Sequence, residues 1–175
     1  MRTIAVLLHS RPDLLERCLT ALINCQDLDK FDKIILSVDS GHKTFNALKE
    51  MAGASAITLR QVVNQCVAIA HPQNLGVVEH PRTVLAHAFE DLGANLHVQI
   101  EDDAVLKPDA LRFALWYEGY SQEHRDVALA SMCNHRAFGQ RQTGGSMPED
   151  DPGIIVETPY VTSPFAWAAT AENWG

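Results

Sequence analysis

Three short apolar segments, each ending in polar or charged residues, constrain the fold of this chain most strongly. They span residues 3–8, 33–38 and 97–103, and strand-forming residues dominate them. In the last segment, apolar residues alternate with other residues at the two-residue period of a β-strand. The stretches between the segments carry helical periodicity instead. This alternation predicts an α/β chain with a mainly parallel central sheet, helices on both faces and a Rossmann-like arrangement.

Helices are expected to connect these strands. Pro12 suits a first helical turn, Ser10 and Asp13 resemble a capping box, and apolar residues follow at helical spacing. Further elements are predicted as helices over residues 44–51, 84–92 and 108–117 and as strands within residues 57–70 and over residues 127–132. Residues 139–153 lack periodicity and are rich in Gly and Pro, which predicts a long loop.

Length and composition limit the number of domains and the class of partner. The chain has 175 residues, of which 46% are hydrophobic, enough for a single domain over residues 1–175. A net charge of -8 without a Lys/Arg stripe argues against nucleic acid as a partner. No apolar run is long enough for a membrane span and no cleavage site follows the N-terminus, so we expect a cytoplasmic chain. The composition does not indicate an oligomeric state.

The four cysteines are scattered among apolar neighbours, at positions 18, 25, 66 and 133. None forms a C-x-x-C pair with another, as structural zinc sites and many redox sites require. Scattered cysteines in a chain without an export signal are typical of reduced thiols in a hydrophobic core. We therefore expect neither disulfides nor a zinc site.

Glu101, Asp102 and Asp103 end the third apolar segment. Because the apolar pattern stops where the acids begin, we expect them at the carboxyl end of a strand, where α/β sheets bind ligands. Two like charges about 4 Å apart repel by about 4 kcal/mol at an effective dielectric constant of about 20, which favours a bound cation or partial protonation. One or two of these carboxylates would hold Mg²⁺ or Mn²⁺, and the others would accept hydroxyl donors. The alternative is a solvated turn that caps the next helix.

Candidate binding residues also follow the first two apolar segments. Arg11 lies in the turn after residues 3–8, where it can hold a phosphate or a base edge or be an exposed surface charge. Asp39 follows residues 33–38 in the same way. Parallel strands bring their carboxyl ends to one edge of the sheet, so we expect both residues to lie near the acidic trio.

This order of residues resembles the nucleotide-sugar half of a GT-A glycosyltransferase, in which an acidic D-x-D or E-D-D motif holds the donor diphosphate through Mn²⁺. Within that class the strongest resemblance is to the N-acetylglucosaminyltransferase I type. The order and spacing of several short matches carry it together. They are Ser10-Arg11, residues 17–19, residues 39–42, residues 80–89, residues 98–103, Pro108-Asp109, Asn134 and residues 167–174.

The resemblance implies a role for each acidic residue of the trio. Asp103, the last acid, would bind the metal, Mn²⁺ or Mg²⁺. Glu101 and Asp102 would lie near the ribose and the sugar of the donor. The chemistry is consistent, because a dication neutralises the diphosphate leaving group as the glycosidic carbon is attacked.

The resemblance also implies three residues for the rest of the nucleotide. Asp39 would accept a hydrogen bond from the imide N–H of uracil, His80 would lie beside the base or ribose, and Arg11 would face the nucleotide or its phosphates. His80 could instead be a histidine on a helix surface. Trp167 could stack on a sugar or belong to the core.

The implied reaction is transfer of a sugar, with GlcNAc as the candidate, from a UDP-sugar to a carbohydrate or other hydroxyl acceptor, with inversion. Such a reaction needs a general base, which the family carries downstream of the segment that resembles residues 165–174. We therefore expect the base beyond Gly175 and the domain to be incomplete at its C-terminus. Asp150, Asp151 and Glu157 are other carboxylates without an assigned role.

Two other functions remain open at this point. A sugar-nucleotidyltransferase has a similar sheet, but it is expected to carry a Gly-rich, basic loop after the first strand. Residues 9–12 contain no glycine. A non-catalytic module that binds nucleotide-sugars is the second alternative, and an assay of donor hydrolysis or transfer would separate it from an enzyme.

Overall fold

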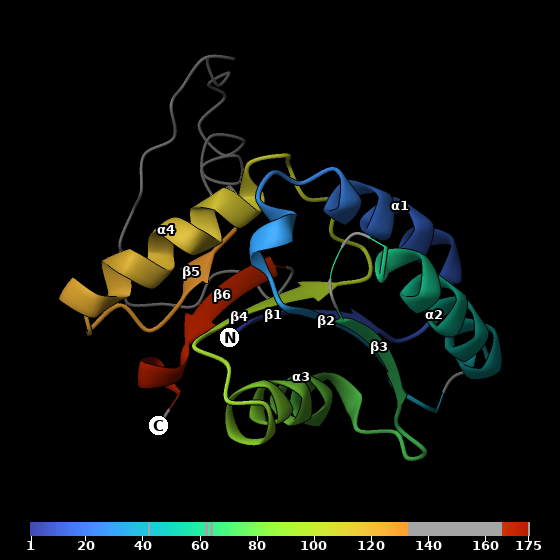
Figure 1. Cartoon of the computed structure of the whole chain (residues 1–175). Coiled ribbons are helices and arrows are strands. Elements are labelled where there is room, and N and C mark those ends of the chain that lie inside the picture. The colour runs from blue at the N-terminus through green and yellow to red at the C-terminus, as the bar shows by residue number, and fades with distance from the viewer. Residues whose placement is uncertain (42, 62, 64, 133–165, 175) are drawn as a thin grey trace, which may run out of the picture.

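The computed structural model describes residues 1–41, 43–61, 63, 65–132 and 166–174. Within these residues, six strands form one sheet in the order β3-β2-β1-β4-β6-β5, and helices cover both of its faces (Figure 1). The strands are β1 (Arg2–Leu8), β2 (Lys33–Val38), β3 (Gln65–Ala70), β4 (Leu96–Glu101), β5 (Ala130–Ser131) and β6 (Ala166–Thr170). Strands β1 to β4 are parallel, whereas β6 is antiparallel to β4 and β5 is antiparallel to β6. The predicted α/β architecture is confirmed.

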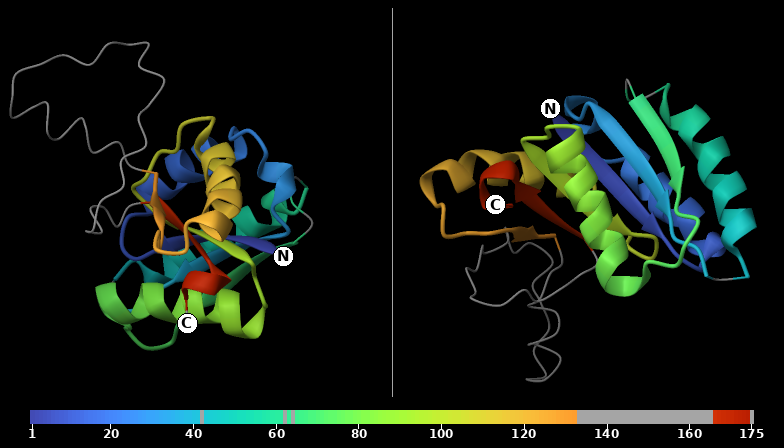
Figure 2. Two further views of the ribbon diagram at one scale, coloured as in Figure 1. Left: turned by 90° about the vertical axis from the view of Figure 1, so that its left-hand side faces the viewer. Right: turned by 90° about the horizontal axis from the view of Figure 1, so that it is seen from below.

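The helices that the structure describes are divided between the two faces of the sheet (Figures 1 and 2). The first group consists of α1 (Pro12–Ile23), α2 (Phe45–Leu59) and α4 (Ala110–Glu123). The opposite face carries α3 (Gly76–Ala86), which continues into a π-helical turn over His87–Asp91. Short 3-10 turns occur at Leu28–Lys30 and Ala171–Asn173.

The larger hydrophobic core fills the space between the sheet and the three-helix face. Ile4 of β1 pairs with Ile34 of β2 and with Val98 of β4, and all three side chains are fully buried. Leu15 and Leu22 of α1 pack against the same layer. A smaller core lies under α3 and is formed by Ala5, Leu7, Ile35 and Val84. The period-two alternation along the strands therefore separates two cores, as it should in a sheet covered on both faces.

The register of the sheet brings three strand ends to one edge. Leu7 of β1 is paired with Ser37 of β2 on one side and with Glu101 of β4 on the other. The backbone N–H groups of Asp39 and Asp102 then donate to the carbonyl oxygens of Leu8 and Leu7. The residues that follow β1, β2 and β4 consequently leave the sheet side by side, which confirms the prediction for the strand ends.

Two helices are longer than predicted. Helix α2 continues from residue 51 to Leu59, because its buried face there consists of Ala52, Ala56 and Leu59 rather than of large apolar residues. Alanine is the best helix former, but it gives a weak periodic signal. Helix α4 continues to Glu123 instead of ending near residue 117.

Helix α3 begins at Gly76, although the sequence pattern predicts a helix only from residue 84. Pro81 lies within it, and a proline inside a helical pattern normally indicates a boundary because it lacks the N–H donor and crowds the preceding turn. The capping box predicted for α1 is also wrong. Arg11 is the N-cap residue, and no side chain caps this helix end.

Strand β6 is absent from the prediction. Its sequence, Ala-Trp-Ala-Ala-Thr, is poor in strand-forming residues, and pairing with β4 places Trp167 opposite Gln99 and Ala168 opposite Val98. Strand β5 spans only two residues of the predicted segment 127–132. Strand propensity depends on neighbours, and here a buried central strand supplies them.

The prediction of reduced core thiols is confirmed for Cys18, Cys25 and Cys66, which are free and buried. Burial raises the pKa of the Cys18 thiol to about 12 and that of the Cys25 and Cys66 thiols to about 11, so all three are protonated at neutral pH. Cys133 lies outside the described residues. Within the part of the chain that the structure describes, the helices are too short or too polar to cross a membrane.

Candidate functional site

The candidate site lies at the carboxyl ends of β1, β2 and β4. Arg11 follows β1, Asp39 follows β2, and Asp102 and Asp103 follow β4. The aligned register of these strands, rather than any local sequence feature, brings the four residues to one edge of the sheet. This edge is where open α/β sheets bind ligands.

Arg11 joins the two aspartates that follow β4. Its Nη2 atom donates to Asp102 Oδ1 at 2.8 Å, and its Nη1 atom donates to Asp103 Oδ2 at 2.5 Å. Pro12 starts α1 immediately after Arg11, which fixes the backbone from which the guanidinium extends. The acidic pair is therefore neutralised in part by a cation of the chain itself.

Asp102 is held more firmly than Asp103. Only 1% of the Asp102 side chain is exposed, and its Oδ2 atom accepts a hydrogen bond from the backbone N–H of His9 at 3.3 Å. Burial raises the pKa of Asp102, against the opposing effect of the His9 N–H and Arg11. Burial and the neighbouring Asp103 also raise the pKa of Glu101. Asp103 is 24% exposed, and its Oδ1 atom has no partner among the described residues.

The unpartnered oxygen of Asp103 is consistent with a metal ligand. Buried carboxylate oxygens normally have a partner, so an orphaned one beside other acids is where a hard cation fits. Within the described residues, no group of three or more His, Cys, Asp or Glu side chains is arranged to hold a metal ion. A divalent ion such as Mg²⁺ or Mn²⁺ at this position would therefore have only one or two carboxylate ligands, and water and phosphate oxygens would have to complete its coordination.

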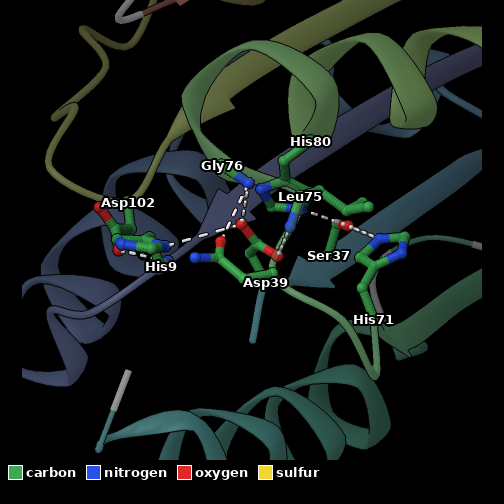
Figure 3. Close-up of polar contacts among 9 residues, drawn as sticks. His9, Ser37, Asp39, His71, Leu75, Gly76, His80 and Asp102 are labelled. Carbon is green, nitrogen blue, oxygen red and sulfur yellow. Dashed lines mark hydrogen bonds and ion pairs between the residues drawn. The ribbon is translucent and has the colours of Figure 1, made fainter. Parts of the chain in front are cut away.

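Asp39 caps the N-terminus of helix α3, although it lies far from that helix in the sequence. Its Oδ1 atom accepts the N–H of Leu75 and its Oδ2 atom accepts the N–H of Gly76, both at 2.9 Å (Figure 3). These N–H groups belong to the first turn of α3 and have no partner within the helix, and the helix dipole favours a carboxylate there. Asp39 is fully buried. The observed role of this carboxylate is to attach the helix to the end of β2.

Gly41 allows the loop after β2 to pack closely against the loop before α3. It has a φ of +96°, and a Cβ atom at this position would lie 2.7 Å from the side chain of Asn74. The loop that follows β2 thus packs directly against the loop that precedes α3. A side chain at Gly41 would push these loops apart and strain the backbone.

His80 takes part in a buried hydrogen-bond network and is not a surface histidine. Its Nε2 atom lies 2.8 Å from Ser37 Oγ, which also lies 2.9 Å from Nε2 of His71 (Figure 3). A serine hydroxyl can donate to one neutral imidazole and accept from the other. Burial lowers the pKa of His80 to about 4 and lowers that of His71, so both rings are neutral at pH 7.

His9 lies between the two parts of the site. Its backbone N–H reaches Asp102, and its Nδ1 atom lies 3.8 Å from Asp39 Oδ2 (Figure 3). The sequence prediction missed His9, and it missed Ser37 and His71 as partners of His80. His9 could have been found because it directly follows a predicted strand. Ser37 and His71 gave no such signal, because only the register and the position of α3 bring them together.

The structure places the predicted residues in two groups. Arg11, Asp102 and Asp103 are in direct contact, with Glu101 at the end of the same strand. Asp39 and His80 belong instead to the packing between β2 and α3. Trp167 packs against a small core cluster of Leu85, Ala88, Phe89, Ala94 and Ala169, as its core alternative predicts. Asp150, Asp151 and Glu157 lie outside the described residues.

Comparison with known proteins gives structural similarity only. No protein-family model and no curated protein matches the sequence. A mannosyltransferase from Pyrobaculum calidifontis, PcManGT, in complex with GDP-Man and Mn²⁺ is 17% identical, with a TM-score of 0.56 over 79% of this chain and 37% of its own. S. aureus TarS 1-349 in complex with UDP-GlcNAc is 15% identical, with a TM-score of 0.51 over 74% of this chain and 33% of its own.

A second S. aureus TarS structure is 15% identical, with a TM-score of 0.50, and the match covers 71% of this chain and 20% of that one. The chain thus spans between one fifth and about two fifths of the length of these structures. At such low identity the similarity concerns the fold alone. This chain has the α/β fold of the GT-A nucleotide-sugar transferases.

Proposed function

We propose that this chain is the donor-binding domain of a metal-dependent glycosyltransferase that uses a UDP-sugar. The observation that carries the proposal is the group formed by Arg11, Asp102 and Asp103 at the carboxyl ends of β1 and β4 in a GT-A sheet. An unpartnered carboxylate oxygen beside a guanidinium can serve both a cation and a diphosphate. The similar structures hold UDP-GlcNAc in one case and GDP-Man with Mn²⁺ in another, which supports this class of ligand.

Asp103 would hold the metal through its Oδ1 atom. A bound Mn²⁺ or Mg²⁺ supplies the charge that neutralises the diphosphate leaving group. Asp102, fixed by the His9 N–H, and Glu101 would accept hydroxyl donors from the ribose and the sugar. Burial raises the pKa of Glu101 and of Asp102, and a hydroxyl donor or a cation nearby would oppose this shift by favouring the ionised carboxylates.

Asp39 and His80 would contact the base and ribose. Each carboxylate oxygen of Asp39 accepts one backbone N–H, and a carboxylate oxygen can accept a second donor such as the imide N–H of uracil. Because Asp39 is fully buried, this contact requires the loop before α3 to move. His80 would act through its neutral imidazole, which Ser37 orients.

The proposed reaction is inverting transfer of a sugar to a carbohydrate or other hydroxyl acceptor. GlcNAc as the sugar and the N-acetylglucosaminyltransferase I type rest on the short sequence matches, since the similar structures carry different nucleotide-sugars. The general base remains unassigned. The residues at the sheet edge would bind the donor and neutralise its diphosphate.

A panel of nucleotides tests the proposal. Thermal unfolding would be measured with UDP, UDP-sugars, GDP-Man, CTP and a sugar 1-phosphate, each with Mn²⁺ and with a chelator. We expect UDP and a UDP-sugar to raise the melting temperature only with Mn²⁺. Asp103→Asn should abolish this rise, whereas the exposed control Asp29→Asn should retain it.

Other outcomes of the same panel would favour the alternatives. Stabilisation by CTP rather than by UDP-sugars, together with release of pyrophosphate from a sugar 1-phosphate, would indicate a nucleotidyltransferase. Stabilisation by a UDP-sugar without hydrolysis or transfer would indicate a binding module. No stabilisation by any nucleotide would contradict the proposed function.

A further inference from the structure

The acidic group after β4 contains its own cation. Arg11 donates one hydrogen bond to each of two different carboxylates, instead of gripping one of them with both of its terminal nitrogens. The bridged aspartates still leave Asp103 Oδ1 without a partner. One positive charge therefore balances two negative charges, and the balance is incomplete.

The three partners differ in how freely they can move. The Asp102 side chain is 1% exposed and is also held by the His9 N–H, so it is fixed. The Arg11 side chain is 42% exposed, and it is long and flexible. Arg11 is therefore the partner that can leave the group, because its side chain is exposed and flexible, whereas Asp102 is buried and keeps the hydrogen bond from the His9 N–H.

We propose that Arg11 is an exchangeable counter-ion: it neutralises Asp102 and Asp103 in the free chain and transfers to the donor diphosphate when a divalent metal binds Asp103. This inference rests on the proposed function. It adds that Arg11 changes its partner from carboxylate to phosphate when the metal binds. No covalent bond changes in this step. The carboxylates exchange a guanidinium for a metal, and the guanidinium exchanges carboxylates for phosphate oxygens, with which it forms equally favourable charged hydrogen bonds.

The exchange couples the two ligands. A metal that binds alone must compete with Arg11 for Asp103. A diphosphate that binds alone must compete with two carboxylates for Arg11. When both ligands bind together, the metal replaces Arg11 at Asp103 and Arg11 pairs with the phosphate oxygens. Asp102 keeps the His9 N–H and gains a hydroxyl donor from the nucleotide-sugar. Arg11 should therefore weaken the binding of free metal and strengthen the binding of the metal–nucleotide pair, which is positive cooperativity through one side chain.

Substitution of Arg11 tests whether the affinities for free metal and for nucleotide change in opposite directions. Mn²⁺ affinity without nucleotide would be measured by electron paramagnetic resonance of the free ion, and UDP affinity at saturating Mn²⁺ would be measured by calorimetry. For Arg11→Met we expect Mn²⁺ to bind about three- to tenfold more tightly, because a competing positive charge is removed from a partly exposed site. UDP should bind about tenfold more weakly, because a charged hydrogen bond to phosphate is lost.

Three further variants serve as controls. Arg11→Lys keeps the charge but not the planar group that reaches both carboxylates, so its free Mn²⁺ affinity should lie between those of the wild-type chain and Arg11→Met. Arg11→Gln removes the charge but keeps a hydrogen-bond donor, so it repeats the test if the methionine variant does not fold. Arg112→Met removes an arginine that pairs with Asp27 at 3.0 Å on the surface, and it should change neither affinity.

The outcomes separate the exchange from the proposed function. Normal UDP binding by the wild-type chain, with Mn²⁺ affinity lowered or unchanged in both neutral variants, would overturn the exchange and leave the function standing. Lack of UDP binding by the wild-type chain would overturn the function and with it the transfer of Arg11 to a diphosphate. Opposite changes in the two affinities would support the exchange.

Discussion

The candidate site has two halves that use their carboxylates in opposite ways. One half, called the nucleoside half after its proposed contact with the base and ribose, comprises Ser37, Asp39, His71 and His80. Its Asp39 accepts two backbone N–H groups and is fully buried. In the acidic half, which comprises Arg11, Glu101, Asp102 and Asp103, the shared partner is a flexible and partly exposed guanidinium. Both halves follow parallel strands at the same sheet edge, so the type of partner distinguishes them.

This difference indicates which half stabilises the fold and which half can exchange its hydrogen-bond partners for a ligand. Main-chain donors at a helix end are fixed by the helix, and a buried carboxylate that loses them has no substitute. A surface arginine pays side-chain entropy and competes with water and salt, so its ion pairs contribute little to stability. We therefore expect the nucleoside half to dominate stability and the acidic half to dominate the response to metal.

Asp39→Ala should have the largest effect on stability. It leaves the N–H of Leu75 without its acceptor and the N–H of Gly76 with only Asn74 Oδ1 at 3.0 Å, and loss of hydrogen bonds to a charged group costs about 3 kcal/mol of unfolding free energy. Urea denaturation would measure the loss. A matched Asp103→Ala should cost less than about 1 kcal/mol, and equal losses in the two variants would remove the distinction between the halves.

The nucleoside half should also make the chain sensitive to acid. Burial lowers the folded-state pKa of His80 to about 4, below the 6.5 of an ordinary histidine, so its contribution is complete above pH 6.5 and is lost as the pH falls toward 4. The unfolding free energy should fall by about 1.4 kcal/mol per pH unit for this one proton. Urea denaturation of His80→Gln and of the wild-type chain between pH 6.5 and 4 would test this. The unfolding free energy of the variant should change less with pH, by about that amount, and an equal pH dependence in the two chains would contradict the burial argument.

The acidic half should respond to pH in the opposite sense. The folded-state pKa values of Glu101 and Asp102 are raised, so their contribution to stability is complete below the unfolded pKa and is lost as the pH rises through the folded value. Acid therefore relieves repulsion among the carboxylates of this half, whereas it destabilises the other half by protonating the buried His80. Metal binding to the acidic half should accordingly weaken as the pH falls.

Ser37→Ala should have a smaller effect than loss of Asp39. The substitution removes the hydroxyl that joins His71 and His80, so two neutral imidazole nitrogens lose a partner at a cost of about 1 to 2 kcal/mol. Thermal unfolding would measure this cost. Ser121→Ala, which removes a hydroxyl that donates to a carbonyl in its own helix, is the control and should cost about 0.5 kcal/mol or less.

The sequence was sufficient to predict the parallel part of the sheet and the edge that its strands share. The apolar strands and the polar residues that end them are local patterns, and parallel pairing converts them into neighbours in space. It was not sufficient to predict the partners. The acceptor for the Leu75 N–H is Asp39, 36 residues away, and the acceptors for Arg11 lie 91 and 92 residues away. The early start of α3 and strand β6 depend on such distant partners, which no local propensity contains.

The most direct test of the central claim is calorimetric titration of the wild-type chain and Asp103→Asn with UDP, each with Mn²⁺ and with a chelator. If the acidic half is a metal-dependent diphosphate site, UDP should bind the wild-type chain at least about tenfold more tightly with Mn²⁺. The variant should lose most of that difference and retain the wild-type melting temperature to within a few degrees. Equal UDP affinity with Mn²⁺ and with chelator, or a metal response that survives Asp103→Asn, would contradict the account.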